Sequence, residues 1–239
     1  MFRNRHKFRG KTLIVEQNEP VTLIGGGAVA AGDLDLALSL APFLVAADGG
    51  ADLALSEGRI PHAVIGDLDS LSNIVRKQLA PNTIYEIAEQ SSTDFHKALR
   101  HIKAPVVLAV GFLGARVDHQ LASFNTLVQV LSSPCILLGE QELVFHVPRE
   151  ISLETEAGET VSLFPMGPVT AESTGLQWPL NGLNMSPMGN IGTSNRALGP
   201  MSLTMEGPGL LGIIPRRHLP QLMQQIAQAP SWSSKAALR

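Results

Sequence analysis

Two aspartates, two residues apart, form the most informative chemical pattern in the sequence. Residues 66–70 read Gly-Asp-Leu-Asp-Ser. In an extended segment, residues two apart point the same way, so Asp67 and Asp69 would present two carboxylates side by side. Such charges repel unless a cation lies between them, and hard oxygen ligands suit Mg²⁺ together with substrate phosphates. A polar turn in which Asp69 or Ser70 caps the next helix explains the same residues. This motif alone leaves both interpretations open.

A third aspartate opens a predicted helix. Thr93 is a good N-cap residue, and Asp94 suits the first turn that follows. Lys97 lies three residues further, one turn along the same face. A carboxylate and an ammonium group at one helix start could hold a metal ion and a phosphate. Ordinary helix capping explains Asp94 equally well.

A glycine-rich loop with charged residues occupies positions 111–120. Gly111 and Gly114 would let the backbone approach a ligand closely. Arg116 offers a planar fork suited to phosphate oxygens, and the amides of the following helix start can bind an anion. Asp118 and His119 could merely cap that helix. The combination of these residue types in one strand-to-helix loop favours a functional interpretation.

Gly25, Gly27 and Ala30 support a competing interpretation. Their spacing after a predicted strand matches the dinucleotide-binding fingerprint, and Asp48 lies about twenty residues further, where an acid would contact a ribose. This pattern is typical of a nicotinamide-dependent oxidoreductase. Hydride transfer, however, gives no joint role to the three aspartates at 67, 69 and 94, whereas metal-assisted phosphoryl chemistry uses all of them.

The elements that must position these residues alternate along the first part of the chain. Strands that alternate with helices predict βαβ units and a mostly parallel, Rossmann-like α/β domain. Ligands bind outside the carboxyl ends of such strands, so we expect the aspartates to share one rim of the sheet. The expected strands are 21–24, 43–47, 63–65, 106–110 and 135–138, and the expected helices are 34–40, 51–57, 94–101 and 119–131.

The pattern changes near Gly139. Short runs broken by Gly, Pro, Asn and Ser follow, which is typical of an all-β sandwich. We therefore predict an α/β nucleotide-binding catalytic domain at 1–139, a β-sandwich domain at 140–215, and a C-terminal helix with a loose tail at 216–239. The expected strands of the second domain are 144–147, 151–153, 160–164, 169–173, 201–205 and 210–214.

Composition limits the remaining classes of function. The 239 residues carry a formal net charge of −3, which indicates neither a nucleic-acid nor a membrane partner. The basic residues 1–11 are not followed by an apolar run, so we expect a solvated tail and not a secretion signal. Cys135 is the only cysteine, which excludes an internal disulfide. We expect a cytoplasmic protein.

Taken together, the motifs resemble one family, the thiamin pyrophosphokinases. The similarity spans about Val21 to Ile214 and includes two unlike halves of the chain. It is carried by four motifs of the first half, which are Asp48–Ala51, Gly66–Ser70, Thr93–Leu99 and Gly111–His119, and by Ser173–Leu180 and Thr193–Asn195 in the second half.

The resemblance implies an enzyme that transfers diphosphate from ATP to thiamin, with Mg²⁺, in a homodimer whose active site lies between the subunits. It places Mg²⁺ on Asp67, Asp69 and Asp94, and the ATP site at Asp48, Lys97, Arg116, Asp118 and His119. It places the thiamin site at Trp178, Ser194 and Asn195. Further ligand-binding positions would be Gly49, Gly50, Ser70, Thr93 and Gly114.

Three alternatives stay open beside this one. They are the oxidoreductase, a related pyrophosphokinase that acts on another alcohol such as a pterin, and a thiamin-binding module without catalysis. For Trp178, the residues alone allow a place in the core of the β domain as readily as a stacking contact with thiamin. Ser194 and Asn195 could equally shape a turn.

Overall fold

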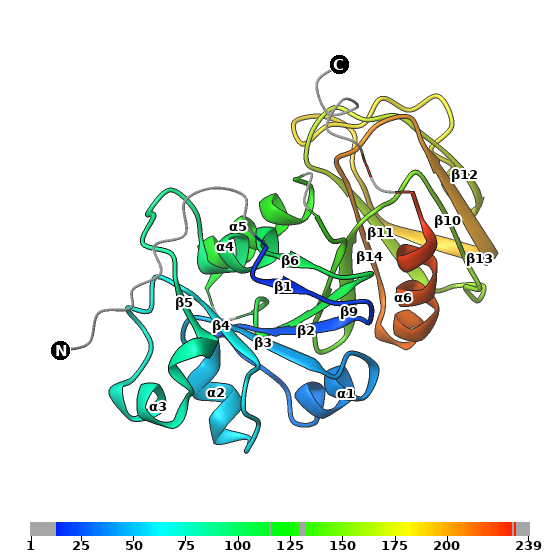
Figure 1. Cartoon of the computed structure of the whole chain (residues 1–239). Coiled ribbons are helices and arrows are strands. Elements are labelled where there is room, and N and C mark those ends of the chain that lie inside the picture. Colours follow the sequence, from blue (N-terminus) through cyan, green and yellow to red (C-terminus); the bar gives the residue numbers. More distant parts are fainter. Residues whose placement is uncertain (1–12, 115, 130–131, 231, 233–239) are drawn as a thin grey trace. The chain divides into compact units, whose positions relative to one another are not determined.

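The computed structural model (Figure 1) describes residues 13–114, 116–129, 132–230 and 232. The predicted basic tail at 1–11 and most of the C-terminal tail lie outside these residues. The described chain has a mixed α/β fold and divides into two compact units. The first contains residues 1–126 and 131–133, and the second contains 127–130 and 134–239. Compactness does not test the functional boundary near Gly139, which stays a prediction.

Parallel strands organise the first unit, as the alternating pattern predicts. β2 (Val21–Ile24) pairs with β7 (Val107–Val110), and β3 (Phe43–Ala47) pairs with β4 (Ala63–Gly66), which pairs with β5 (Ile84–Glu86). β1 (Val15–Glu16) and β6 (Ile102–Lys103) form a further parallel pair. β2, β4 and β7 are buried along their whole length. Burial on both faces explains why these strands read as continuous apolar runs.

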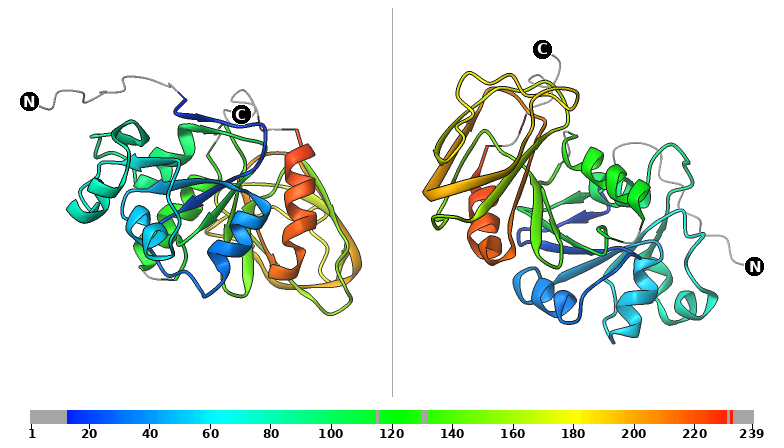
Figure 2. Two further views of the ribbon diagram at one scale, coloured as in Figure 1. Left: turned by 60° about the horizontal axis from the view of Figure 1, so that its bottom comes forward. Right: turned by 180° about the vertical axis from the view of Figure 1, so that it is seen from behind.

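Helices cover both faces of these strands. α1 (Asp33–Leu40), α2 (Gly50–Ser56) and α3 (Asn73–Gln78) lie on one side, and α4 (Asp94–Arg100) and α5 (Val117–Leu127) lie on the other (Figures 1 and 2). Ser72 caps α3, and Thr93 caps α4 through a hydrogen bond from the His96 amide. Because the strands run parallel, their carboxyl ends lie at one edge, where the loops to α2, α4 and α5 begin.

Antiparallel strands make up the second unit. β8 (Cys135–Leu138) pairs with β9 (Glu142–His146), β9 pairs with β14 (Leu210–Pro215), and β14 pairs with β11 (Thr160–Pro165). The long strand β13 (Gly192–Met205) pairs with β11 through its first half, and with β10 (Glu150–Leu153) and β12 (Ala171–Leu176) further on. The 3₁₀ turn Arg216–His218 leads into α6 (Leu219–Gln228), which buries Leu222 and Ile226.

Most of the predicted elements are present, and the differences have local causes. The prediction missed β1, β5, β6 and α3, which are too short to show a period in the sequence. It recognised only residues 201–205 of β13, because Gly199 and Pro200 interrupt the strand pattern. The expected helix at 119–131 begins earlier and ends at Leu127. Among the described residues, no helix is both long and apolar enough to cross a bilayer.

Glu159 joins the start of β11 to the turn before α6 in the second unit. Its carboxylate accepts hydrogen bonds from the Arg217 side chain and, at 2.8 Å, from the Glu156 amide. The buried His218 ring lies 3.0 Å away. Hydrogen bonding from Arg217, which outweighs partial burial, lowers the pKa of Glu159 from 4.5 to about 2. A carboxylate with a lowered folded-state pKa stabilises the fold above its unfolded pKa.

We therefore expect Glu159→Gln to lower the Tm at pH 7 by about 3–6 °C, because the substitution removes the charge that these donors recognise. The Tm difference from the wild type should shrink as the pH falls from 4.5 towards about 2, the range over which wild-type Glu159 loses its advantage. Calorimetry across pH measures this difference. Glu172→Gln, at an exposed position of β12, serves as the control. A pH-independent difference would contradict the assignment.

Candidate active site

A cavity of about 520 Å³ lies within the first unit, at the carboxyl ends of its strands. The residues that follow β2, β3, β4 and β7 all contribute to its wall, together with the starts of α4 and α5. Of the aspartates predicted at this rim, Asp48, Asp67 and Asp94 line the cavity, and Asp69 and Asp118 do not. The lining includes Gly25–Gly27, Asp48, Gly49, Asp67, Ser70, Gln90, Ser92–Phe95, Lys97, Gly111–Leu113, Arg116, His119 and Ser123.

Three carboxylates converge in this cavity. One oxygen each of Asp48, Asp67 and Asp94 lies within 4.8 Å of the others, which is close enough for one metal ion to bind all three. Asp48 and Asp67 follow the ends of β3 and β4, and Asp94 begins α4. The Asp67 amide donates to Asp94 Oδ1 at 3.3 Å, which fixes two members of the group relative to each other.

Lys97 neutralises part of this charge. Its Nζ lies 2.7 Å from Asp67 Oδ2 and 3.0 Å from Asp94 Oδ1, and the residue is 1% exposed. Burying an ammonium group would be costly without such partners. When all three aspartates are ionised, the cluster keeps two net negative charges, which matches the charge of one divalent cation.

Three groups of this cluster, Asp48, Asp67 and Lys97, have shifted pKa values. Burial is the largest single effect on both Asp67 and Lys97 and opposes their ionised forms. The hydrogen bonds and charge attraction of their neighbours together outweigh it, so the pKa of Asp67 is lowered and that of Lys97 is raised. Asp48 behaves differently. Burial raises the pKa of Asp48 against the hydrogen bonding by Ser70, and the charges of Asp94 and Asp67 add to the increase.

Backbone geometry brings the carboxylates this close. Asp48 has a φ of 41°, an uncommon value for a residue with a side chain, and its amide donates to Ile65 O at 3.1 Å. Gly66 lies beside it. A Cβ at position 66 would lie 2.8 Å from Asp48 Cβ and 3.1 Å from Asp94 Oδ1. Only glycine at this position lets the two aspartates approach.

Asp69 is not one of the three carboxylates whose oxygens converge, although its amide and its side chain interact with the Asp67 carboxylate. Leu68 has a φ of 65°, so residues 67–69 are not extended as we expected, yet the side chains of Asp67 and Asp69 still interact. Asp69 is exposed and accepts a hydrogen bond from the Ser70 hydroxyl at 2.9 Å. The Ser70 amide in turn donates to Asp48 Oδ2 at 3.2 Å. Asp69 therefore stays a prediction as a metal ligand, while the geometry adds Asp48.

Arg116, Asp118 and His119 lie at the start of α5. Arg116 and His119 line the cavity, and Arg116 makes two hydrogen bonds to Asp118, at 3.1 and 2.6 Å. Both side chains of this pair are about two thirds exposed. Exposed ion pairs contribute little to the stability of a protein. Arg116 could therefore give up its contact with Asp118 and bind a phosphate instead. Gly114 adopts a φ of 90°, which favours glycine.

The glycine segment 25–27 contacts the same cavity but does not form a dinucleotide site. In the dinucleotide fingerprint, the glycine turn opens directly onto a helix whose N-terminus binds the pyrophosphate. Here α1 begins only at Asp33, after Gly32 in the left-handed conformation. Asp48, which the fingerprint would assign to a ribose, instead joins the other two carboxylates. The geometry therefore disfavours the oxidoreductase.

The second unit holds the residues predicted to contact thiamin. Trp178 is 54% exposed, which excludes a place in the core. The buried Asn195 side chain holds its backbone, accepting from the Trp178 amide at 3.1 Å and donating to the Trp178 carbonyl at 2.7 Å. The Ser194 amide donates to the Ser162 hydroxyl at 2.9 Å, and Ser194 has a φ of 59°. Asn195 thus fixes the backbone from which the exposed indole ring projects.

Several cavity residues were missed in the sequence. Phe112 lines the wall and packs against Phe95, with ring centroids 4.4 Å apart. Gln90 and Ser92 come from the loop before α4. Their position directly before the Thr93 cap was the available signal, since loops beside a ligand-binding helix start commonly contribute contacts.

The residues fit a divalent metal ion. Asp48 Oδ1 is buried and has no hydrogen-bond partner among the described residues, a costly state that a bound cation would relieve. Carboxylate oxygens are the ligands that Mg²⁺ prefers. The donor set therefore supports the predicted cation and identifies Asp48 as a candidate ligand beside Asp67 and Asp94.

Comparison with known proteins identifies both parts of the chain. Residues 34–137 match the family of the thiamin pyrophosphokinase catalytic domain, and residues 144–206 match that of its vitamin B1 binding domain. Thiamine pyrophosphokinase 3 of rice (Oryza sativa subsp. japonica) is 32% identical over 154 residues, covering 56% of this chain. Thiamine pyrophosphokinase 2 of rice is 30% identical over 180 residues, covering 67% of each chain.

The chain spans 58% of the length of the rice thiamine pyrophosphokinase 3 and 61% of thiamine pyrophosphokinase 1 of Arabidopsis thaliana. Among solved structures, yeast thiamin pyrophosphokinase is similar with a TM-score of 0.69 at 19% identity, covering 93% of this chain and 96% of that one. This likeness shows a shared fold.

We expect Lys97→Met to lower the free energy of unfolding at pH 7 by about 3 kcal/mol, because it leaves the carboxylates without their buried counterion. The sign of the pH dependence follows from Asp67, whose lowered pKa stabilises the fold only while Lys97 is present. The difference from the wild type should therefore shrink as the pH falls below the usual aspartate value of 3.8. Urea titration at several pH values measures it, and an equally stable variant would contradict the pairing.

Proposed function

Because the chain belongs to the thiamin pyrophosphokinase family, we propose that it transfers diphosphate from ATP to the hydroxyl of thiamin and releases AMP. The observation that carries this proposal is the convergence of Asp48, Asp67 and Asp94 around one buried lysine, at the carboxyl ends of parallel strands. A cavity with that charge suits a polyphosphate bound together with a divalent cation.

The thiamin hydroxyl oxygen attacks the β-phosphorus of ATP, and the bond from that phosphorus to the oxygen bridging to the α-phosphate breaks. The hydroxyl proton is lost, and AMP leaves with the bridging oxygen. Lys97 places a positive charge between two of the carboxylates. Arg116, on the cavity wall, exchanges Asp118 for phosphate oxygens. Such fixed charges stabilise the transition state more than the ground state.

Asp48, Asp67 and Asp94 would hold Mg²⁺, with Asp69 a further candidate outside the group of converging carboxylates. When bound, the ion neutralises phosphate charge and orients the reacting groups. Asp48 contributes the unpartnered buried oxygen, while Ser70 orients its other oxygen. The glycines at 49 and 50 keep this loop free of side chains, since a Cβ on Gly50 would lie 2.2 Å from Ile24 O.

We assign thiamin to the second unit, where Trp178 would stack on a ring and attract the thiazolium cation. The match of residues 144–206 to a vitamin B1 binding domain supports this role. We further propose a Rossmann-like first domain, a β-sandwich second domain, and a homodimer with the active site between subunits. These finer points rest on the resemblance, and the match to a vitamin B1 binding domain favours thiamin over a pterin.

The decisive assay incubates the protein with ATP, thiamin and Mg²⁺ and identifies the products by mass. AMP and thiamin diphosphate are expected, and ADP with thiamin monophosphate would contradict diphosphate transfer. In the same assay, Asp67→Asn should lower kcat/KM at least about a hundredfold, because it removes a charge from the metal and lysine contacts. Retention of the fold is checked by circular dichroism. Full activity in this variant would remove Asp67 from the site.

Trp178→Ala should raise the KM for thiamin about tenfold and leave the KM for ATP unchanged, because only the stacking and cation–π contact is lost. The matched control is Leu198→Ala, another exposed apolar residue of the second unit. Steady-state kinetics with each substrate varied separately gives both values. An unchanged KM for thiamin would show that the indole ring does not contact it.

A further inference from the structure

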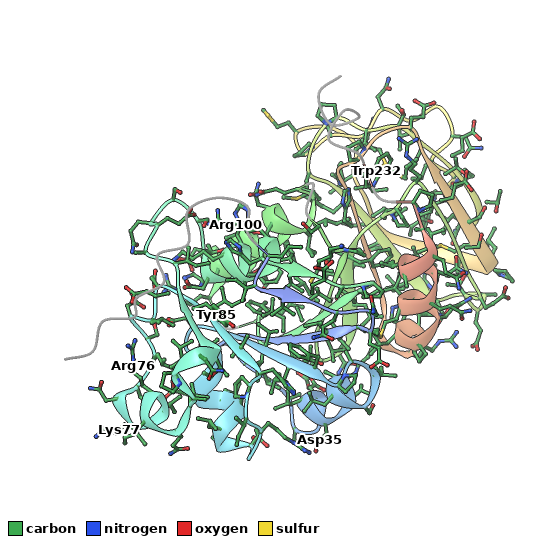
Figure 3. All side chains as sticks on the ribbon, viewed as in Figure 1. Asp35, Arg76, Lys77, Tyr85, Arg100 and Trp232 are labelled. Atoms are coloured by element: carbon green, nitrogen blue, oxygen red, sulfur yellow. The ribbon has the colours of Figure 1, made fainter. Side chains whose placement is uncertain are left out.

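Glu89 is the centre of a network behind the loop that enters α4. Its carboxylate accepts two hydrogen bonds from Arg100, from Nη1 at 3.3 Å and Nη2 at 2.9 Å. It also accepts from the hydroxyl groups of Ser91, at 3.3 Å, and Ser92. One side chain thus collects donors from the loop and from the far end of the helix. Figure 3 shows Arg100 where α4 ends.

These contacts close residues 89–100 into a ring. The loop leaves Glu89, reaches the Thr93 cap, continues through the whole of α4, and returns to Glu89 through the Arg100 side chain. Just before the ring, the Ile87 amide donates to Gly66 O at 2.7 Å, next to Asp67. The entrance of the loop is therefore fixed to β4, and its exit is fixed to α4.

The residues inside this ring form one side of the cavity. Gln90, Ser92 and Thr93 line it from the loop, and Asp94 and Lys97 line it from the helix. Ser92 does both, because its hydroxyl donates to Glu89 while the residue borders the cavity. Glu89 itself does not line the cavity, so any effect on a bound ligand must pass through the loop.

Charge and exposure suit a positioning role. The side chains of Arg100 and Glu89 are 31% and 34% exposed. Hydrogen bonding by Arg100 and then Ser92 lowers the pKa of Glu89 to about 2, so it is ionised throughout the neutral range. An ion pair this exposed adds little to global stability. Its main effect is to restrict the conformations of the loop, which otherwise carries exposed Gln90 and Ser91.

We propose that Glu89 is a positioning residue which, through Arg100 and Ser92, holds residues 90–93 in the conformation that receives the polyphosphate of the nucleotide. This inference rests on the proposed function for the identity of the ligand. The three carboxylates of the metal site are held by other contacts, namely those of Lys97, Ser70 and the Asp67 amide. Loosening the loop should therefore weaken nucleotide binding more than metal binding.

The test compares Glu89→Ala with Asp35→Ala, each as the full-length protein. Asp35 forms an exposed ion pair with Arg59 at 2.7 Å in the same unit, on α1 and well away from Arg100 (Figure 3). Glu89→Ala should raise the KM for ATP about tenfold, as expected for misplaced binding groups, and leave the affinity for Mn²⁺ alone within about twofold of the wild type. Asp35→Ala should change neither. Equal KM values for ATP in the two variants would overturn the proposal, and so would parallel losses of ATP and Mn²⁺ affinity.

Arg100→Ala and the double variant separate positioning from general destabilisation. If the two side chains act as one unit, the double variant should show no higher KM for ATP than either single variant. Multiplied effects of the two substitutions would overturn the proposal.

The failure of the proposed function is distinguished by a separate measurement. If the wild type binds Mg·ATP but makes no thiamin diphosphate, calorimetry of Mg·ATP binding replaces the KM. Equal affinity of wild type and Glu89→Ala would then overturn the positioning role, and a wild type that binds no Mg·ATP would overturn both.

Discussion

The main physical constraint on the site is the electrostatic repulsion among three carboxylates that the fold holds close together. Asp48, Asp67 and Asp94 come from separate segments, and their oxygens lie within 4.8 Å of each other. One buried ammonium group, that of Lys97, offsets a single charge through Asp67 and Asp94. The remaining charge, together with an Asp48 Oδ1 that has no hydrogen-bond partner among the described residues, is consistent with the cation of the proposed function. Such a concentration of charge destabilises a folded protein, and clusters of this kind are therefore typical of functional sites.

Several features of the first unit serve to maintain this arrangement. Parallel pairing brings the ends of β3 and β4 together, and the Thr93 cap starts α4 beside them. Gly66 leaves room for two carboxylates, and positive φ values at Asp48 and Leu68 direct the chain around them. Backbone conformations of this kind are unfavourable by themselves. The surrounding buried strands must hold them in place, which explains why a rigid apolar sheet lies beneath a polar site.

The second unit differs from the first in that it exposes an aromatic ring, that of Trp178. An exposed indole would be free to rotate away from a ligand if its backbone were mobile. From a buried position, Asn195 fixes that backbone through hydrogen bonds with both the amide and the carbonyl of Trp178. The two units thus supply complementary chemistry. In the proposed function, the charged groups of the first unit would bind a polyphosphate, and the exposed face of Trp178 in the second would bind an aromatic cation.

The sequence alone predicts the order of most helices and strands, the change to an all-β pattern in the second half, and the placement of acids after strand ends. These follow from local periodicity and from glycine and capping residues, which act over a few positions. It did not determine which acids meet. The two-residue spacing placed Asp69 beside Asp67, but it gave no sign that Asp48 would join the converging carboxylates after another strand. The pairing of Lys97 with two aspartates and the ring closed by Glu89 and Arg100 also depend on the tertiary structure and could not be predicted from the sequence. Side-chain direction depends on backbone angles and on neighbours distant in sequence, and a linear pattern does not contain them.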